Sequence, residues 1–492
     1  MRSTGYKKYR NAGAGLIALV LLLYVPDPAP ALPSPAAAQA FVWDQDDVWR
    51  SIEARFAAAR QAGCTAVGAE LDAQLDALAA DIAWIEGGGI APGNERFDGL
   101  EDRLFAAASL TGACPQSVSS LVGQVTRLRA ALKVQSRDWD LTQQDSRRRL
   151  YRLLYGGRTL VEELLLQGAG SELPTIITGT DEPSQTPAAV VAGVELHSGD
   201  ILVSRGGAPV SALIARGNDY PGNFSHIALV HIDESGEIRI IEAHIEVGVT
   251  VSSAETYLAD KKLRIMVLRL DHALEALRDD PLLPHRAATA ALEEGLTRHV
   301  PYDFAMHYED PRKKFCSEVA SAVYAERGVS LWEGLTSMSS RGVTAWLSRL
   351  GVEKFETYGP SDLEYDPKMV VVAEWRDPEA LFADHVDNAV IDALLEGAER
   401  GDELDYAYRE LPLARIAKAY SVLLNLFGKA GPVPEGMSAT RALRAQWLDG
   451  RHEAVKKGVL ARVDNFRKDR GYTPPYWELL AMARASLAGI EG

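Results

Sequence analysis

Hydrophobic and polar positions divide the chain into two helical regions around a strand-rich centre. Between residues 41 and 168, apolar side chains recur every three or four positions, which is the spacing of amphipathic helices. Turn signals such as Gly87-Gly-Gly89 interrupt the pattern, so we expect an antiparallel bundle. Its predicted helices cover residues 48–62, 70–85, 97–108, 118–132 and a long segment at 137–167.

Helical spacing returns after Pro378, in a C-terminal region of residues 377–492. The pattern leaves open whether this region packs on the N-terminal bundle or binds a protein partner. A break at Gly431-Pro-Val-Pro434 divides the predicted helices, which cover residues 380–397, 411–427, 439–448 and 476–487.

The centre of the chain, residues 190–376, contains segments with the period of two that is typical of strands. A segment at 169–189, rich in Gly, Ser, Pro and Thr, precedes it as a predicted linker. Strands between two helical regions predict an α+β fold. The strands are expected at 201–204, 223–230, 240–245, 262–270 and 369–374, with a helix at 282–296.

Two of these strands carry side chains that point to chemistry. Side chains alternate along a strand, so His226 shares a face with Ala228 and Val230. On the next strand, Glu242 and His244 share a face. A histidine beside a second polar group is the arrangement that an oriented general base requires.

The register of this hairpin decides which residue lies beside His226. A three-residue turn with Gly236 in the left-handed conformation is predicted, and it pairs the residues that flank it. This preferred register sets His226 opposite His244, with Glu242 as a diagonal neighbour. A shift of two residues would set His226 opposite Glu242, so the residues alone leave the orienting group open.

Cys316 is predicted to begin a helix at 316–324. A thiol at a helix N-terminus lies at the positive end of the helix dipole, which favours the thiolate. Nucleophilic catalysis by cysteine needs this thiolate, a base and a group that holds the base. Each residue taken alone is common as a structural residue, but the three together favour a catalytic site. The predicted buried stripe of the helix is Val319, Ala320, Val323 and Tyr324.

The same motifs resemble a known family. They look like the permuted papain-like amidases of the YaeF/YiiX type, which are relatives of the NlpC-type cell-wall peptidases. In that permuted order the histidine precedes the cysteine, as it does here. The motifs are Gly199-Asp-Ile-Leu202, Ser225-His226, Glu242-Ala243, Pro301-Tyr-Asp-Phe304 and Phe315-Cys-Ser-Glu318. The whole resemblance spans about residues 190–376.

The resemblance implies a papain-like domain with an antiparallel sheet, flanked by the two helical regions. It implies Cys316 as nucleophile, His226 as base and Glu242, rather than His244, as the orienting acid. The implied activity is hydrolysis of amide bonds, with cell-wall peptides as the expected substrate. A lipid acyl bond is the alternative substrate, and a non-catalytic binding module is the alternative of a different class.

No cofactor or metal is expected, because the sequence contains neither an HExxH nor a CxxC motif. The formal net charge of −16 argues against a nucleic-acid partner, which would select a basic surface.

The N-terminus has the pattern of a signal peptide. Basic residues at positions 2, 7, 8 and 10 precede an apolar run at 14–25, which is short for a membrane span. Ala38-Gln-Ala40 is a cleavage signal, so residues 1–40 are predicted to be removed. The mature chain would then be periplasmic or secreted, with no stable membrane anchor. An uncleaved anchor is the alternative.

The three cysteines fit an exported protein. Cys64 and Cys114 both lie near predicted helix ends, where a disulfide would close a long loop. Two unrelated buried thiols are the alternative. Either way, Cys316 stays unpaired, as a nucleophile must.

Overall fold

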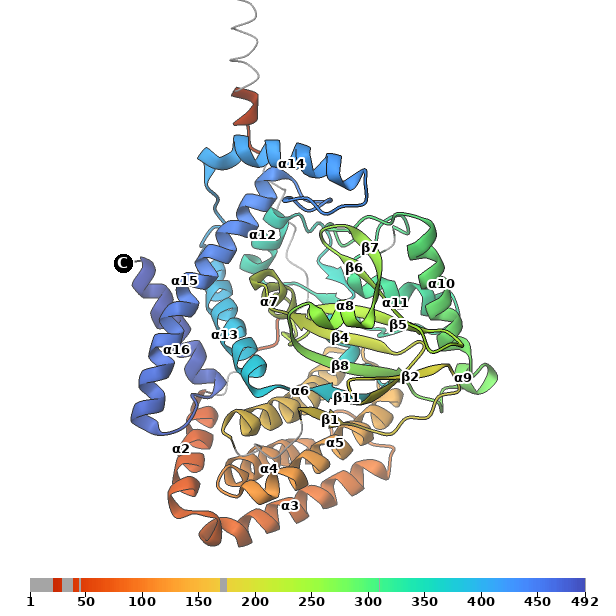
Figure 1. The fold of residues 1–492 in the computed structure, drawn as a ribbon. Coiled ribbons are helices and arrows are strands. Elements are labelled where there is room, and N and C mark those ends of the chain that lie inside the picture. The colour runs from red at the N-terminus through yellow and green to blue at the C-terminus, as the bar shows by residue number, and fades with distance from the viewer. Residues whose placement is uncertain (1–20, 29–38, 44–45, 169–174, 309, 492) are drawn as a thin grey trace, which may run out of the picture.

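The protein folds around a central antiparallel sheet, with helical regions before and after it in the chain (Figure 1). This computed structural model describes residues 21–28, 39–43, 46–168, 175–308 and 310–491. The N-terminal helices lie below the sheet in Figure 1, and the C-terminal helices run along one side of it. The α+β class predicted from the sequence is therefore confirmed.

The main sheet has seven strands in the order β1-β11-β8-β4-β5-β6-β7, and each neighbouring pair is antiparallel. Its strands are β1 (Ile176–Thr178), β4 (Ile201–Gly206), β5 (His226–Ile232), β6 (Ile238–His244), β7 (Gly248–Ser253), β8 (Lys262–Leu270) and β11 (Met369–Trp375). Two short pairs lie outside it: β2 (Ala188–Val191) with β3 (Val194–His197), and β9 (Thr336–Ser337) with β10 (Glu356–Thr357).

Strand β1 lies within the segment that was expected to be a linker. It pairs with the end of β11, so that Ile176 is level with Trp375. The strand has only 3 residues, which is too few for an alternating pattern to be recognised in the sequence.

Helix α6 begins later than the sequence pattern predicted, at Gln144 rather than at residue 137. Asp140 explains this start: its carboxylate accepts hydrogen bonds from the backbone N–H (3.0 Å) and the hydroxyl (2.6 Å) of Thr142. Such a side-chain turn competes with helical hydrogen bonds. The bundle helices are α2 (Asp46–Ala62), α3 (Cys64–Glu86), α4 (Arg96–Thr111), α5 (Val118–Gln135) and α6 (Gln144–Leu166).

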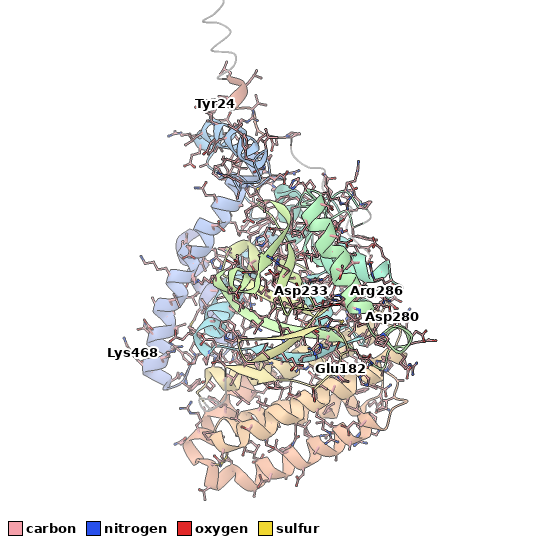
Figure 2. All side chains as sticks on the ribbon, turned by 45° about the vertical axis from the view of Figure 1, so that its right-hand side comes forward. Tyr24, Glu182, Asp233, Asp280, Arg286 and Lys468 are labelled. Atoms are coloured by element: carbon pink, nitrogen blue, oxygen red, sulfur yellow. A yellow bond between two sulfur atoms is a disulfide. The ribbon has the colours of Figure 1, made fainter. Side chains whose placement is uncertain are left out.

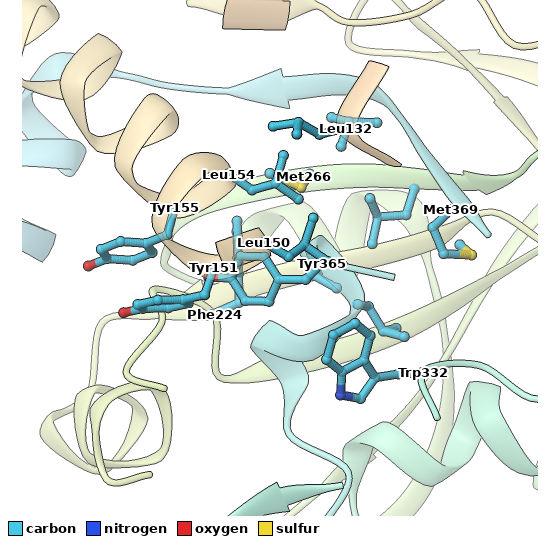
Figure 3. Packing of buried hydrophobic residues seen from close by; sticks show 14 of the residues in the cluster. Leu132, Leu150, Tyr151, Leu154, Tyr155, Phe224, Met266, Trp332, Tyr365 and Met369 are labelled. Atoms are coloured by element: carbon cyan, nitrogen blue, oxygen red, sulfur yellow. The ribbon is translucent and has the colours of Figure 1, made fainter. Parts of the chain in front are cut away.

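The bundle and the sheet share one hydrophobic core (Figure 3). Leu150 and Leu154 of α6 pack in the same cluster as Met266 of β8 and Met369 of β11. The helices inserted between the strands are α7 (Pro209–Arg216), α8 (Ala254–Ala259), α9 (Glu275–Asp279), α10 (Leu283–Thr297), α11 (Cys316–Ala325) and α12 (Arg341–Leu350).

Helix α15 is much longer than predicted and runs from Ala439 to Arg470. Lys468, near its end, lies far from Tyr24 in Figure 2. Gly458 lies inside the helix and packs against α16, where an added Cβ would come within 2.8 Å of the Ser486 side chain. The C-terminal helices are α13 (Pro378–Arg400), α14 (Leu411–Asn425), α15 (Ala439–Arg470) and α16 (Tyr476–Glu491).

The C-terminal region packs on the N-terminal bundle, one of the two arrangements that the sequence left open. Trp49 of α2 stacks on Trp477, near the start of α16, with ring centroids 5.7 Å apart and planes 7° from parallel. Phe56 and Tyr472 make a second contact between the regions, edge to face, with centroids 5.3 Å apart.

Buried charges join all three regions. Arg158 and Glu162 of α6 form an ion pair at 2.6 Å, and Glu162 pairs with Arg264 of β8 at 2.7 Å. Arg264 pairs in turn with Asp384 of α13. Each of these side chains is at most 4% exposed. Their burial means that each charge depends on its partners rather than on water.

Cys64 and Cys114 form a disulfide, as one of the two alternatives from the sequence predicted. It connects the start of α3 to the segment after α4 and closes a loop with a sequence separation of 50. Of the three cysteines, all within the described residues, Cys316 is the free one, and it is buried.

The predicted signal peptide lies mostly outside the described residues, which begin at Leu21 and omit 29–38. Among the helices that are described, none combines the length and the apolar character that crossing a membrane would require.

We predict that Arg158→Leu lowers the free energy of unfolding by about 3–5 kcal/mol, because Glu162 and Glu364 would be left buried without their guanidinium partner. Urea denaturation followed by circular dichroism measures this loss. The matched control is Arg127→Leu, which removes a surface pair with Glu86 and should leave the urea midpoint almost unchanged. Equal midpoints for both variants would show that the buried charges do not hold the regions together.

Candidate active site

The structure brings the three predicted site residues together. His226 is the first residue of β5, Glu242 lies in β6, and Cys316 is the first residue of α11. Helix α11 packs against both strands, which places its N-terminus beside the start of β5. Its predicted apolar stripe is buried, with Val319, Ala320, Val323 and Tyr324 all in the core.

The hairpin adopts the register that the turn predicted. Ala228 is level with Glu242, and Gly236 in the turn has a φ of 83°. The backbone N–H of Asp233 donates to the carbonyl of Glu237 at 3.2 Å. Continued to the end of the strands, this register sets His226 level with His244.

Glu242 nevertheless bonds His226, from the diagonal position. Its Oε2 lies 2.7 Å from Nε2 of His226, and its Oε1 lies 3.0 Å from Nε2 of His244. Of the two candidates, Glu242 is the one that bonds His226, although the register sets His244 opposite His226. A glutamate side chain is long enough to reach diagonally across a strand pair, and here one carboxylate bridges two imidazoles.

Glu242 and His244 differ in how deeply they are buried, and this difference gives them different roles beside His226. The Glu242 side chain is 4% exposed, whereas that of His244 is 35% exposed. Burial alone would raise the pKa of Glu242, but its bonds to His226 and His244 outweigh burial and hold the pKa far below its usual range. Glu242 is therefore a fixed negative charge beside His226.

The same neighbours set the charge of His226. Burial alone would lower the pKa of the imidazole, but the neighbouring Cys316 side chain and the Glu242 carboxylate raise it to about 9. An imidazole with this pKa holds a proton at neutral pH. Its charged form is the one that would stabilise a thiolate at the neighbouring Cys316.

Cys316 is held at the position where a helix dipole acts most strongly. It is 3% exposed, and its Sγ lies 3.8 Å from the carbonyl oxygen of Ser225, the residue before His226. At the first position of α11, its backbone N–H has no acceptor within the helix. This N–H can donate to an oxyanion that forms on a carbonyl attacked by Cys316.

Glu318 fixes the start of this helix, a role that the sequence reading did not assign. Its carboxylate accepts from the backbone N–H of Phe315 at 3.0 Å, while the N–H of Glu318 donates to the carbonyl of Phe315 at 3.1 Å. Burial raises the pKa of Glu318 to about 8. The available signal was incomplete: Glu318 follows Phe315 at the spacing of a capping box, but Phe315 lacks the Ser or Thr hydroxyl of that motif.

The loop before His226 is supported from two other elements. Arg158 of α6 donates to the side-chain oxygen of Asn223 at 3.0 Å. Ser361 accepts from the backbone N–H of Phe224 at 3.1 Å and donates to the carbonyl of Phe224 at 2.9 Å. These bonds fix the backbone just before His226, and none of them could be read from sequence spacing.

Two groups of side chains within the described residues have ligand atoms close enough together to hold a metal ion. One is His226, Glu242 and His244, whose ligand atoms lie within 4.8 Å of one another. A metal bound there would occupy the His226 nitrogen that bonds Glu242. The other group, Glu182, Asp271 and His272, lies apart from Cys316 in the sequence and on other elements.

Comparison with known proteins agrees with the geometry. Residues 195–373 match the family described as permuted papain-like amidase enzyme, YaeF/YiiX, C92 family. No match was found among curated proteins. The match begins in β3 and ends in β11, so it contains His226, Glu242 and Cys316 and leaves both helical regions outside. The similarity to the permuted papain-like amidases is therefore confined to the central residues 195–373 of the chain.

Proposed function

We propose that the protein is a cysteine hydrolase that cleaves amide bonds through Cys316, His226 and Glu242. The observation that carries the proposal is the 2.7 Å bond between Glu242 and His226, formed beside a buried cysteine at a helix start. The family match supports an amidase or peptidase of the cysteine type.

Catalysis would proceed by acyl transfer. In the thiolate–imidazolium pair, His226 already holds the proton of Cys316, and the thiolate attacks the carbonyl carbon of the substrate. The N–H of Cys316 stabilises the resulting oxyanion. As the C–N bond breaks, protonated His226 gives its proton to the leaving amine, and a thioester remains on Cys316. Water, deprotonated by His226, then hydrolyses the thioester and regenerates the thiol.

Glu242 would act through His226 rather than on the substrate. Its carboxylate fixes the imidazole ring and stabilises the imidazolium that forms. His244, bonded to the other oxygen of Glu242, is a second positioning residue with a smaller effect.

The proposed substrate is a cell-wall peptide amide, supported by the relationship of the family to NlpC-type peptidases and by the export signal that the sequence predicts at residues 1–40. In this proposal the chain acts in the periplasm or outside the cell, after cleavage near Ala40. The alternative is a lipid acyl bond, which is favoured by an exposed apolar helix outside the matched domain. A purely binding role for the domain would leave the Cys316–His226–Glu242 arrangement without a use.

We predict that purified protein releases amine products from peptidoglycan fragments and that Cys316→Ala abolishes the release. Mass spectrometry of the products, with phospholipids tested in parallel, distinguishes amide from acyl-ester cleavage. A chelator should leave the rate unchanged. Activity that survives in Cys316→Ala, or that depends on added metal, would contradict the proposed mechanism.

Glu242 is the proposed orienting residue of the triad. We predict that Glu242→Gln lowers kcat by ~10² to 10⁴-fold, because the His226 imidazole loses its fixed orientation and its counter-charge. His244→Gln, made as the matched control on the same strand face, should lower kcat much less. KM and thermal stability should change little in both. A larger loss in His244→Gln would make His244 the orienting residue instead.

The raised pKa of His226 also predicts a pH profile. The ratio kcat/KM should fall as the pH rises through about 9, since neutral imidazole cannot protonate the leaving amine. Glu242→Gln should move this fall to lower pH, because one of the two groups that raise the pKa is removed. The raised pKa of His226 also stabilises the folded protein. This contribution to stability is fully present below pH 6.5 and is lost as the pH rises through about 9. An alkaline limit that Glu242→Gln leaves in place would show that the limit does not report His226.

A further inference from the structure

One face of α14 exposes a continuous row of large apolar side chains. Leu413 is 69% exposed and Phe427, just after the helix, is 72% exposed. The row follows alternating steps of three and four residues, so its members share one face. The row consists of Leu413, Ile416, Tyr420, Leu423 and Phe427, and Leu426 is exposed beside it. Soluble proteins rarely expose a row of this kind without a binding partner.

The opposite face of α14 packs on the protein. Leu411 is buried in a small cluster with Ala439 and Leu443 of α15, and Ala414 packs against that cluster. The helix is therefore held in place by α15, and its apolar row points away from the core.

The apolar segment at the N-terminus of the sequence meets the same helix. Arg415 donates to the carbonyl oxygen of Leu22 at 2.8 Å and also bonds that of Val25. Tyr24 packs against Tyr408, with ring centroids 5.8 Å apart. Figure 1 shows this first described segment next to α14, and Figure 2 shows Tyr24 at the same end of the molecule. The described end of the apolar run, residues 21–25, therefore contacts Arg415 of α14 and Tyr408 just before that helix.

The charge of this region differs from that of the whole chain. The segment 408–430 carries four basic residues and one acidic residue, although the chain has a formal net charge of −16. An apolar face flanked by basic side chains is typical of helices that lie in the interface of a membrane with anionic lipids. The basic residues are Arg409, Arg415, Lys418 and Lys429; Arg409 and Lys429 are exposed, whereas Arg415 and Lys418 donate to backbone carbonyls of the protein.

We propose that the apolar face of α14 inserts into the surface of an anionic phospholipid bilayer and attaches the protein to it. The apolar row, the basic flanks and the adjoining apolar N-terminal run all fit this one occupant. A bilayer is compatible with either outcome at the N-terminus. If the signal peptide is not cleaved, residues 14–25 would enter the same bilayer. If it is cleaved, α14 would remain as the attachment. The inference concerns attachment and does not depend on the proposed catalysis.

Attachment at α14 would also fix the orientation of the active site. Lys418 donates to the carbonyl oxygens of Pro434 at 2.8 Å and Glu435 at 2.6 Å. The backbone N–H of Glu435 donates to the carbonyl of Glu246, two residues after His244, at 3.3 Å. The segment after α14 thus connects the membrane-facing helix to the strand that carries Glu242.

A position-specific probe tests insertion separately from anchoring by the N-terminus. The full-length chain with Cys316→Ala receives one new cysteine, Leu423→Cys on α14 or Leu460→Cys on α15, labelled with an environment-sensitive dye. Leu460 is the control because it is also exposed but lies on another helix. With vesicles of phosphatidylcholine and phosphatidylglycerol, we expect a blue shift and quenching by brominated lipid at position 423 only.

A second experiment measures affinity. The substitutions Leu413→Gln, Ile416→Gln and Leu423→Gln together should lower the vesicle partition coefficient by about tenfold or more, because each removes apolar area from the inserted face. Circular dichroism melting confirms that this surface variant is folded. The proposal would be overturned if the dye at position 423 showed no blue shift while the protein was bound to vesicles, or if the triple substitution left the partition coefficient unchanged. It would also be overturned by a blue shift that grows with protein concentration in the absence of vesicles, because that would indicate a second copy of the chain on this face.

Discussion

The buried charges on α6, β8 and α13 are the constraint on which the arrangement of the three regions depends. Arg158, Glu162, Arg264 and Asp384 are almost fully buried and come from segments up to 226 residues apart in the numbering, from 158 to 384. A buried charge without its partner is strongly unfavourable, so none of these elements can shift alone. The helical regions are therefore structural parts of the same unit as the sheet, although the family match does not include them.

This constraint reaches the active site through one side chain. Arg158 binds both Glu162 and Asn223, and Asn223 lies three residues before His226. The backbone between them is held by Ser361. The bundle thus fixes the backbone just before His226, and Glu242 fixes the imidazole ring. Catalytic geometry of this kind needs rigid support, because a small displacement of the base weakens proton transfer.

The sequence predicted those features of the fold and the site that depend on residues close together in the chain. The hairpin register followed from the turn at Gly236, and the helix at Cys316 followed from its apolar spacing, because each involves neighbours in the chain. The diagonal reach of Glu242 needed the shape of a twisted strand pair. The contact of Gly458 in α15 with α16 and the bonds to Asn223 involve distant segments and leave no local pattern.

The most direct test of the account is the titration of the His226 ring itself. Nitrogen NMR of protein labelled at histidine, with His226 assigned by its loss in His226→Asn, needs no substrate. The account predicts a pKa of about 9, lowered in both Cys316→Ala and Glu242→Gln, because the thiol and the carboxylate each raise it. A pKa at or below the ordinary 6.5, or one that neither substitution lowers, would contradict the thiolate–imidazolium pair at the centre of the proposed chemistry.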